Sequence, residues 1–153
     1  MKVEYVNPFL EAFYEVILQV INVKSVKGKL YIKEGSQSKS GEVIISIGVT
    51  GDLNGNVLMN MDEEAAKCIA SKMMFGMEVS VFDDMAKSAI AELGNMIAGN
   101  SAAFFAKMDK IINITPPTLY TGKNLNIYNY KTHNLCIPMS VDGNVVEIDI
   151  CIS

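Results

Sequence analysis

The residues best suited to chemistry lie in one short run, Ser88-Ala-Ile-Ala-Glu92-Leu-Gly-Asn95-Met-Ile-Ala-Gly99. In a helix each residue advances about 100° around the axis, so Ser88, Glu92, Asn95 and Gly99 would share one arc. A carboxylate and a carboxamide three positions apart then project side by side, about 4.5 Å apart along the axis. An ordinary solvated face has the same pattern. The functional alternative is a shallow docking face that presents an acid and an amide to another molecule.

The helix that carries this run is predicted to extend from Asp83 to Lys107. Asp83 is a suitable N-cap, and the preceding Phe82 is placed to pack as a hydrophobic staple. A second arc is apolar and wide enough to be buried against a sheet. Its members are Ala86, Ile90, Leu93, Ile97 and Phe104.

Composition limits the classes of function. The chain has 153 residues, half of them hydrophobic and 20% charged, which is typical of one globular domain. A net charge of −4 and the absence of a Lys/Arg cluster argue against nucleic acid as a partner. No apolar run approaches the roughly 18 residues of a membrane span, and the N-terminus has no signal-peptide pattern. We therefore expect a cytoplasmic protein.

The usual catalytic groups are missing from the sequence. Cys68, Cys136 and Cys151 are too scattered for a disulfide framework or a zinc site, and we interpret them as buried residues in a reducing compartment. His133 is the single histidine, which disfavours a His-based triad. No Gly-rich phosphate loop and no Gly-x-Ser-x-Gly motif occurs. We predict no metal site and no cofactor of the chain's own.

The remaining pattern predicts an α+β fold. A first helix is expected from Asn7, which is available as its cap, to about Asn22, and another follows Asp62. Alternating apolar residues predict strands at 43–49, 53–61, 135–141 and 146–152. In the last of these, Glu147, Asp149 and Cys151 are expected to face solvent. Pro116-Pro117 indicates an edge or a crossing connection, and this interpretation is preferred to a contact with a partner.

The order of elements suggests a two-layer, mostly antiparallel sheet covered by long helices. It also hints at an internal duplication of a helix-plus-strands unit, with halves of about 1–78 and 79–153 in one domain, 1–153. Both halves begin with a long helix and end in a hairpin, although sequence similarity between them is faint.

The run Ser88-x3-Glu92-x2-Asn95 resembles the helix signature of the CheC/CheX/FliY phosphatases of bacterial chemotaxis. The resemblance to the CheX branch continues through Ile47-Gly-Val-Thr-Gly51, Met74-Phe-Gly-Met77 and Ile114-Thr-Pro-Pro-Thr118-x3-Gly122, and it covers nearly the whole chain. It implies a CheC-like fold. Where relatives of the CheC type carry the motif in both halves, the first helix here has Glu11-Ala-Phe-Tyr14. One site per chain is expected.

The resemblance implies a phosphatase that acts on the phosphoaspartate of a CheY-like response regulator. Asn95 would orient the attacking water, Glu92 would pair with the regulator's active-site lysine, and the regulator would bring its own Mg²⁺. Ser88, Ala91, Met96 and Gly99 would form the surrounding contact surface. The resemblance also implies a homodimer formed edge to edge between sheets. The alternative is a non-catalytic adaptor that docks a response regulator or another signalling partner through the same helix.

Overall fold

The computed structural model describes residues 3–33, 41–128 and 134–153. The helical elements are η1 (Val3–Tyr5), α1 (Asn7–Ile21), α2 (Glu63–Met73) and α3 (Asp84–Ala106). The strands are β1 (Val26–Lys27), β2 (Tyr31–Lys33), β3 (Gly41–Gly51), β4 (Gly55–Met61), β5 (Ile112–Ile114), β6 (Thr118–Leu125), β7 (Asn134–Val141) and β8 (Asn144–Ile152).

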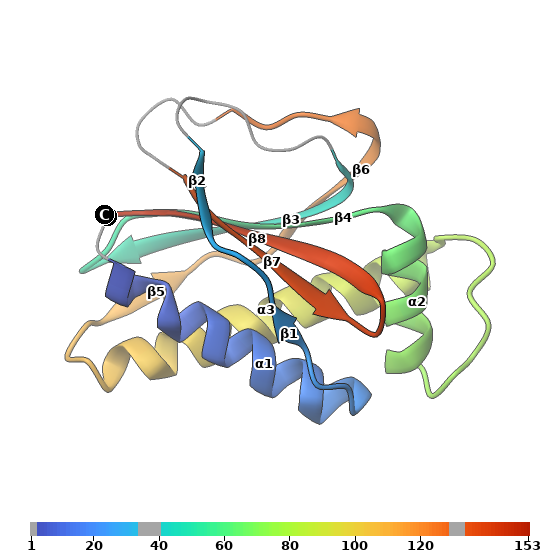
Figure 1. Cartoon of the computed structure of the whole chain (residues 1–153), viewed down its shortest axis with the longest axis horizontal. Coiled ribbons are helices and arrows are strands. Elements are labelled where there is room, and N and C mark those ends of the chain that lie inside the picture. The colour runs from blue at the N-terminus through green and yellow to red at the C-terminus, as the bar shows by residue number, and fades with distance from the viewer. Residues whose placement is uncertain (1–2, 34–40, 129–133) are drawn as a thin grey trace.

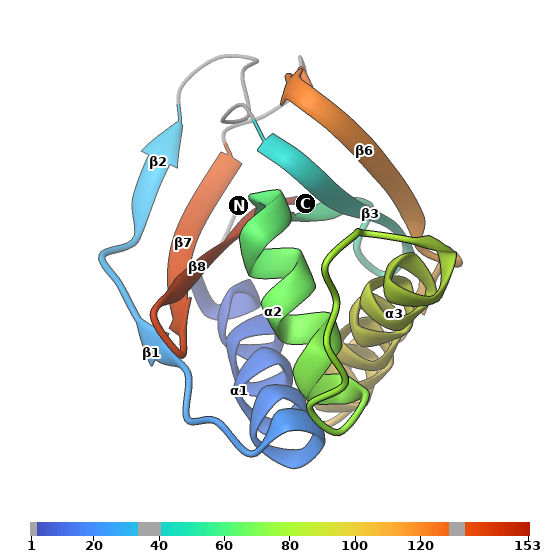
Figure 2. The same ribbon diagram turned by 90° about the vertical axis from the view of Figure 1, so that its right-hand side faces the viewer.

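These strands form one sheet in which every described pairing is antiparallel. The order is β1-β7-β8-β4-β3-β5, with β2 also pairing with β7 and β6 also pairing with β3. Helices α1 and α3 lie along one face of the sheet, and α2 stands at one end (Figure 1). The view from that end shows α1 and α3 side by side beneath the sheet (Figure 2). The predicted α+β class and the two-layer arrangement are confirmed.

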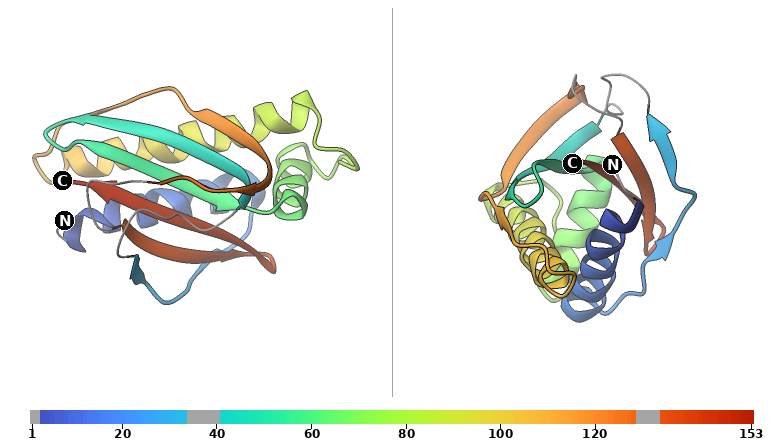
Figure 3. Two further views of the ribbon diagram at one scale, coloured as in Figure 1. Left: turned by 90° about the horizontal axis from the view of Figure 1, so that it is seen from above. Right: turned by 90° about the vertical axis from the view of Figure 1, so that its left-hand side faces the viewer.

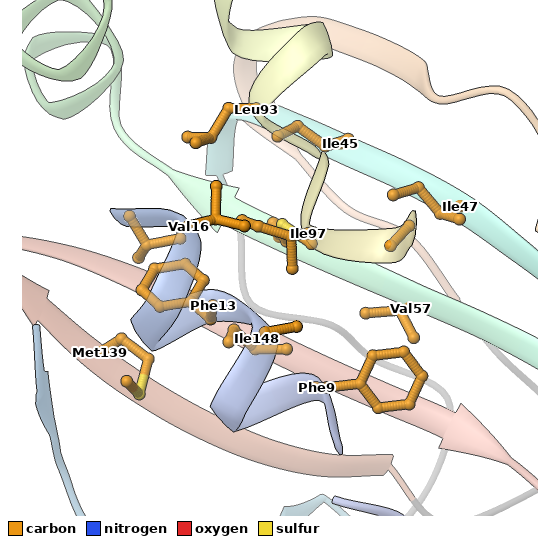
Figure 4. Close-up of a cluster of buried hydrophobic side chains, with 14 of the residues drawn as sticks. Phe9, Phe13, Val16, Ile45, Ile47, Val57, Leu93, Ile97, Met139 and Ile148 are labelled. Atoms are coloured by element: carbon orange, nitrogen blue, oxygen red, sulfur yellow. The ribbon is translucent and has the colours of Figure 1, made fainter. Parts of the chain in front are cut away.

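The core lies between this sheet face and the helices. Side chains at alternate positions of the long strands point toward α1 and α3, as the period of two in the sequence requires. One buried cluster contains Phe9 and Phe13 of α1, Leu93 and Ile97 of α3 and Ile148 of β8 (Figure 4). Phe9 also packs edge-on against Phe105, with 5.3 Å between ring centroids. These contacts fix both long helices on the sheet.

Each half of the chain contributes a helix, two edge segments and a hairpin. The edge strands β1 and β2 of the first half pair with β7, and β5 and β6 of the second half pair with β3. The two hairpins meet where β4 pairs with β8. Views from above and from the far end show this interleaving (Figure 3). That the order arose by duplication of residues 1–78 and 79–153 remains a prediction.

The prediction that one face of β8 is exposed to solvent is wrong. Glu147, Asp149 and Cys151 are all buried, and so are Ile44 and Leu58 on the same face of the sheet. The physical reason is that the edge strands curl over this face, away from the helices (Figure 2). Side chains of β2 reach past β7 to Glu147 of β8. Alternation in a sequence cannot show that a strand's polar side will be covered by a distant edge strand.

Two local expectations also need correction. Asn7 is not the cap of α1, because the 3₁₀ turn η1 precedes the helix and Val6 occupies the cap position with no side-chain hydrogen bond. In α3 the fully buried aromatic residue is Phe105, whereas Phe104 is only half-buried. Near its C-terminus the helix therefore buries Phe105, which packs against α1, in place of the predicted Phe104.

Candidate functional site

Helix α3 is held rigidly against the sheet at the level of the candidate residues. Its N-terminus is capped as predicted, since the backbone N–H of Ala86 donates to Asp83 Oδ1 at 3.0 Å. Gly94 lies directly against β3: a Cβ at this position would lie 2.7 Å from Ile45 Cγ2. Only glycine allows this approach, because carbon atoms at that distance would clash. The backbone of the helix is thus in close contact with the sheet at Gly94, between Glu92 and Asn95.

The structure places the predicted site residues on the outer side of α3. Ser88, Glu92, Asn95 and Gly99 are exposed, whereas Ala91 and Met96 are half-buried. A Cβ added at Gly99 would meet no atom within 4 Å, so this part of the helix is open. Among the described residues, neither Glu92 nor Asn95 makes a side-chain hydrogen bond or ion pair. Their polar groups are available to another molecule.

The exposed pair borders a groove of about 510 Å³ between α3 and the segment that joins β5 to β6. One wall consists of Ser88, Ala91, Glu92 and Asn95. The opposite wall is formed by residues 114–117, Ile114-Thr-Pro-Pro117, named here the proline strap. Met96 and Gly99 do not line the groove; Met96 packs against the core on the other flank of the helix.

Sequence reasoning missed the second wall. The sequence predicts an edge or crossing segment at Pro116 and Pro117, and they do lie between β5 and β6. The same two residues also line the groove opposite Asn95. The two prolines before Thr118 indicate that this segment is extended. Its position beside α3 depends on the antiparallel pairing of β5 with β3, which brings together residues far apart in the sequence.

A separate polar cluster lies on the buried outer face of the sheet. Glu147 accepts hydrogen bonds from Tyr31 Oη at 2.5 Å and Lys33 Nζ at 3.1 Å, and Lys33 Nζ lies 3.9 Å from Asp149 Oδ2. Burial raises the pKa of the Asp149 carboxyl to about 6. Burial opposes the charge of Lys33, but the neighbouring Asp149 and Glu147 raise the pKa of its ammonium group.

This cluster is also where a metal ion could be held in the described part of the chain. Ligand atoms of Cys136, Glu147 and Asp149 all lie within 4.8 Å of one another. The Lys33 ammonium already lies beside Glu147 and Asp149, and a cation at the same place would compete with it. The cluster is on the sheet face opposite the helices and contributes nothing to the groove. None of the predicted site residues belongs to it.

The groove itself offers a carboxylate, a carboxamide and hydroxyl groups. An amide can donate one hydrogen bond and accept another at the same time, so it can orient a water molecule against a second group. A carboxylate attracts a cation such as a lysine side chain. These groups can position reactants, but a nucleophile with an adjacent base is missing from the groove residues. The arrangement suits a protein that completes another molecule's reactive site.

Fold and site together define a CheC-like α+β protein with an acid and an amide displayed on one long helix. A crystal structure of a CheC-like superfamily protein from Shewanella sp. PV-4 has a TM-score of 0.89 at 25% identity and covers 100% of this chain and 99% of its own. The family model described as "Chemotaxis phosphatase CheX" matches residues 43–140. The chain belongs to this family.

Individual relatives agree with this assignment. The CheY-P phosphatase CheX of Thermotoga maritima is 35% identical over 141 residues, which span 92% of this chain and 90% of the relative. The CheX in the CheX–CheY–BeF3–Mg²⁺ complex from Borrelia burgdorferi has a TM-score of 0.82 and 34% identity, with 99% of both chains covered. CheX from Desulfovibrio desulfuricans shares the fold, with a TM-score of 0.89 at 22% identity and 99% and 100% coverage.

None of the described helices combines the length and the apolar character needed to cross a membrane.

Proposed function

We propose that this chain accelerates loss of phosphate from the phosphoaspartate of a CheY-like response regulator, with Asn95 as the catalytic residue and Glu92 as the anchor. One observation carries the assignment of roles: Glu92 and Asn95 are exposed, have unused polar groups and share one wall of a groove. The activity itself is supported by the relatives, of which one is a CheY-P phosphatase and another was crystallised with CheY.

The chemistry fits a lone carboxamide. Hydrolysis of an acyl phosphate needs a water molecule aligned with the breaking P–O bond and stabilisation of the charge that develops on the phosphoryl oxygens. The Asn95 amide can accept a hydrogen bond from the attacking water while its N–H donates to a phosphoryl oxygen. Water attacks phosphorus and the P–O bond to the aspartate breaks; the aspartate carboxylate stays in the regulator, and inorganic phosphate leaves with the oxygen and the protons of the water. Orientation is the main contribution of such a group.

Glu92 is proposed to dock rather than to react. Its carboxylate lies one helical turn before Asn95 on the same exposed arc, where it can pair with the lysine expected in the regulator's active site. Ser88 and Gly99 flank the pair along the helix and are small, so the rim of a partner can approach the amide closely. The proline strap closes the other side of the groove.

The regulator is proposed to supply the remaining parts. Its own Mg²⁺ would neutralise charge on the phosphoryl oxygens, so this chain would act without a metal of its own. We also propose that the protein works in the cytoplasm, with its regulator, and as a homodimer. The sheet ends at β6, an eight-residue strand whose side chains are mostly exposed, and such an edge can pair with a second copy.

The test is phosphate release from the cognate regulator phosphorylated with a small phosphodonor. The parent protein should accelerate release, and Asn95→Ala should abolish the acceleration, a loss on the order of a hundredfold or more. The matched control is Asn100→Ala, which removes a half-buried carboxamide about 140° around the same helix and should stay active. Asn95→Ala should still bind the regulator. Release as fast as with the parent would refute the role of Asn95.

A further inference from the structure

Exposed apolar side chains are concentrated beside the start of α3. Val81 and Met85 are 68% and 61% exposed. Phe75 and Met77, in the connection between α2 and α3 that also carries Val81, are exposed as well. Isolated apolar residues on a surface need no explanation, but a group of them in one short segment marks an interaction site. The polar site residues described above begin only one turn later, at Ser88.

Met85 lies on the same face of the helix as the proposed catalytic pair. It precedes Glu92 by seven residues, two helical turns, so the two side chains differ by about 20° around the axis. Ala89 and Met96 continue an apolar row on the side of Glu92 away from Asn95, and both are half-buried. The polar pair therefore lies between two apolar margins, the proline strap on one side and the row that begins at Met85 on the other.

The segment that carries Val81 is fixed in position. The next residue, Phe82, is buried and belongs to the hydrophobic core. The backbone N–H of Asp83 donates to the Val81 carbonyl at 2.9 Å, and Asp83 in turn caps the helix. Because the residues that follow it, Phe82 and Asp83, are anchored, Val81 is held at the surface. A partner would meet it already ordered, which lowers the entropic cost of binding.

The groove is too small to be the whole contact with a folded protein. A stable interface covers about 800 Å² on each partner, or roughly 20–30 residues, and its energy comes from apolar anchors enclosed by polar contacts. The C-terminal part of α3 offers little exposed apolar surface. The Phe104 ring there is covered by Lys107, whose Nζ lies 5.0 Å from the ring centroid. The uncovered apolar surface continuous with Glu92 lies toward the N-terminus.

We infer that Val81 and Met85 form an apolar anchor for the response regulator, which covers them when its phosphorylated site meets Asn95. This inference rests on the proposed function and extends its contact surface from Ser88 back to Val81. Methionine suits the role because its flexible thioether side chain adapts to a partner's surface. The anchor contributes to binding in the ground state and in the transition state alike, so it lowers KM and leaves kcat unchanged.

The experiment uses the double variant Met85→Gln with Val81→Thr, which keeps side-chain length and shape but adds polar groups. Its affinity for the regulator activated with beryllofluoride, a stable mimic of the phosphoryl group, should fall about tenfold or more. KM for the phosphorylated regulator should rise by the same factor, with kcat within about twofold. The matched control carries Met108→Gln with Val3→Thr, at residues 38% and 67% exposed and away from the start of α3. It should behave like the parent.

The outcomes separate this inference from the proposed function. If the parent protein accelerates phosphate release but the Val81 and Met85 double variant binds as tightly as the parent, the anchor is refuted and the proposed function stands. If the parent gives no acceleration, the proposed function is refuted, and the affinity measurement alone decides whether Val81 and Met85 contact the regulator. An equal loss of affinity in the control variant would also refute the anchor. So would a change in oligomeric state confined to the Val81 and Met85 variant, since a second copy would then cover these residues.

Discussion

Gly48 of β3 and Thr115 of the proline strap are joined by two hydrogen bonds. The Gly48 N–H donates to Thr115 Oγ1 at 2.8 Å, and the Thr115 N–H donates to the Gly48 carbonyl at 3.0 Å. The approach is so close that a Cβ at Gly48 would lie 2.9 Å from Thr115 Cγ2. The pairing of β5 with β3 thus continues one residue beyond Ile114, and the wall of the groove opposite Asn95 is fixed to the sheet.

Thr115→Val should loosen this wall without changing its shape. The variant loses the acceptor for the Gly48 N–H but keeps a branched side chain of the same size. We expect KM for the phosphorylated regulator to rise severalfold, with little change in kcat or in thermal stability. Thr115→Ser retains the hydroxyl and should restore the parent value. A Thr115→Val protein with unchanged KM would show that the strap does not contact the regulator.

Gly94→Ala should displace α3 from the sheet. The new methyl group would lie 2.7 Å from Ile45 Cγ2 in a fully buried environment, and overpacking of this kind costs about 1–3 kcal/mol of unfolding free energy. Gly99→Ala is the matched control, because its methyl group meets no atom within 4 Å and alanine favours a helix by about 0.5–1 kcal/mol. Urea unfolding measures both. Equal stability of the two variants would contradict the close contact at Gly94.

Glu92→Lys should weaken binding of the regulator more than it affects the chemical step. The reversed charge would face the lysine with which Glu92 is proposed to pair, and like charges in an interface oppose association. Binding to the beryllofluoride-activated regulator can be followed by calorimetry at two salt concentrations. Glu11→Lys on α1 makes the same change in net charge at another exposed position and should bind normally. Equal affinity of the Glu92 and Glu11 variants would rule out the anchor role of Glu92.

Asp149→Asn should stabilise the protein near neutral pH. Burial raises the pKa of this carboxyl in the folded chain from its ordinary value of 3.8 to about 6. Between these values the folded state binds more protons than the unfolded state, so the contribution of Asp149 to stability falls as pH rises from about 4 to about 6. The variant should be more stable than the parent by about 1–3 kcal/mol at pH 7, and the difference should shrink toward pH 4.

The measurement for Asp149 is urea unfolding of both proteins at several pH values from 4 to 7. A difference between parent and variant that stays constant over this range would show that the Asp149 carboxyl titrates normally. Because Asp149 is remote from the groove, phosphate release should be unaffected at pH 7.

Residue spacing along the chain accounts for the elements and for the presentation of the site. Helical periodicity over residues 83–107 placed Glu92 and Asn95 on an arc separate from Leu93 and Ile97, and the structure has the first pair exposed and the second pair buried. The cap at Asp83 could also be read locally. These features depend on spacing within one helix, where geometry leaves little freedom. The roles of the two residues in catalysis remain predictions.

What lies beside these elements depends on contacts between segments far apart in the chain. The proline strap faces Asn95 because β5 and the residue after it pair with β3, a strand more than sixty residues earlier in the chain. Glu147 and Asp149 are buried because β2 curls over their face of the sheet, although their strand alternates as a half-exposed strand does. Periodicity reports which side of an element is apolar. It carries no information on which distant segment will cover the other side, because that depends on long-range pairing.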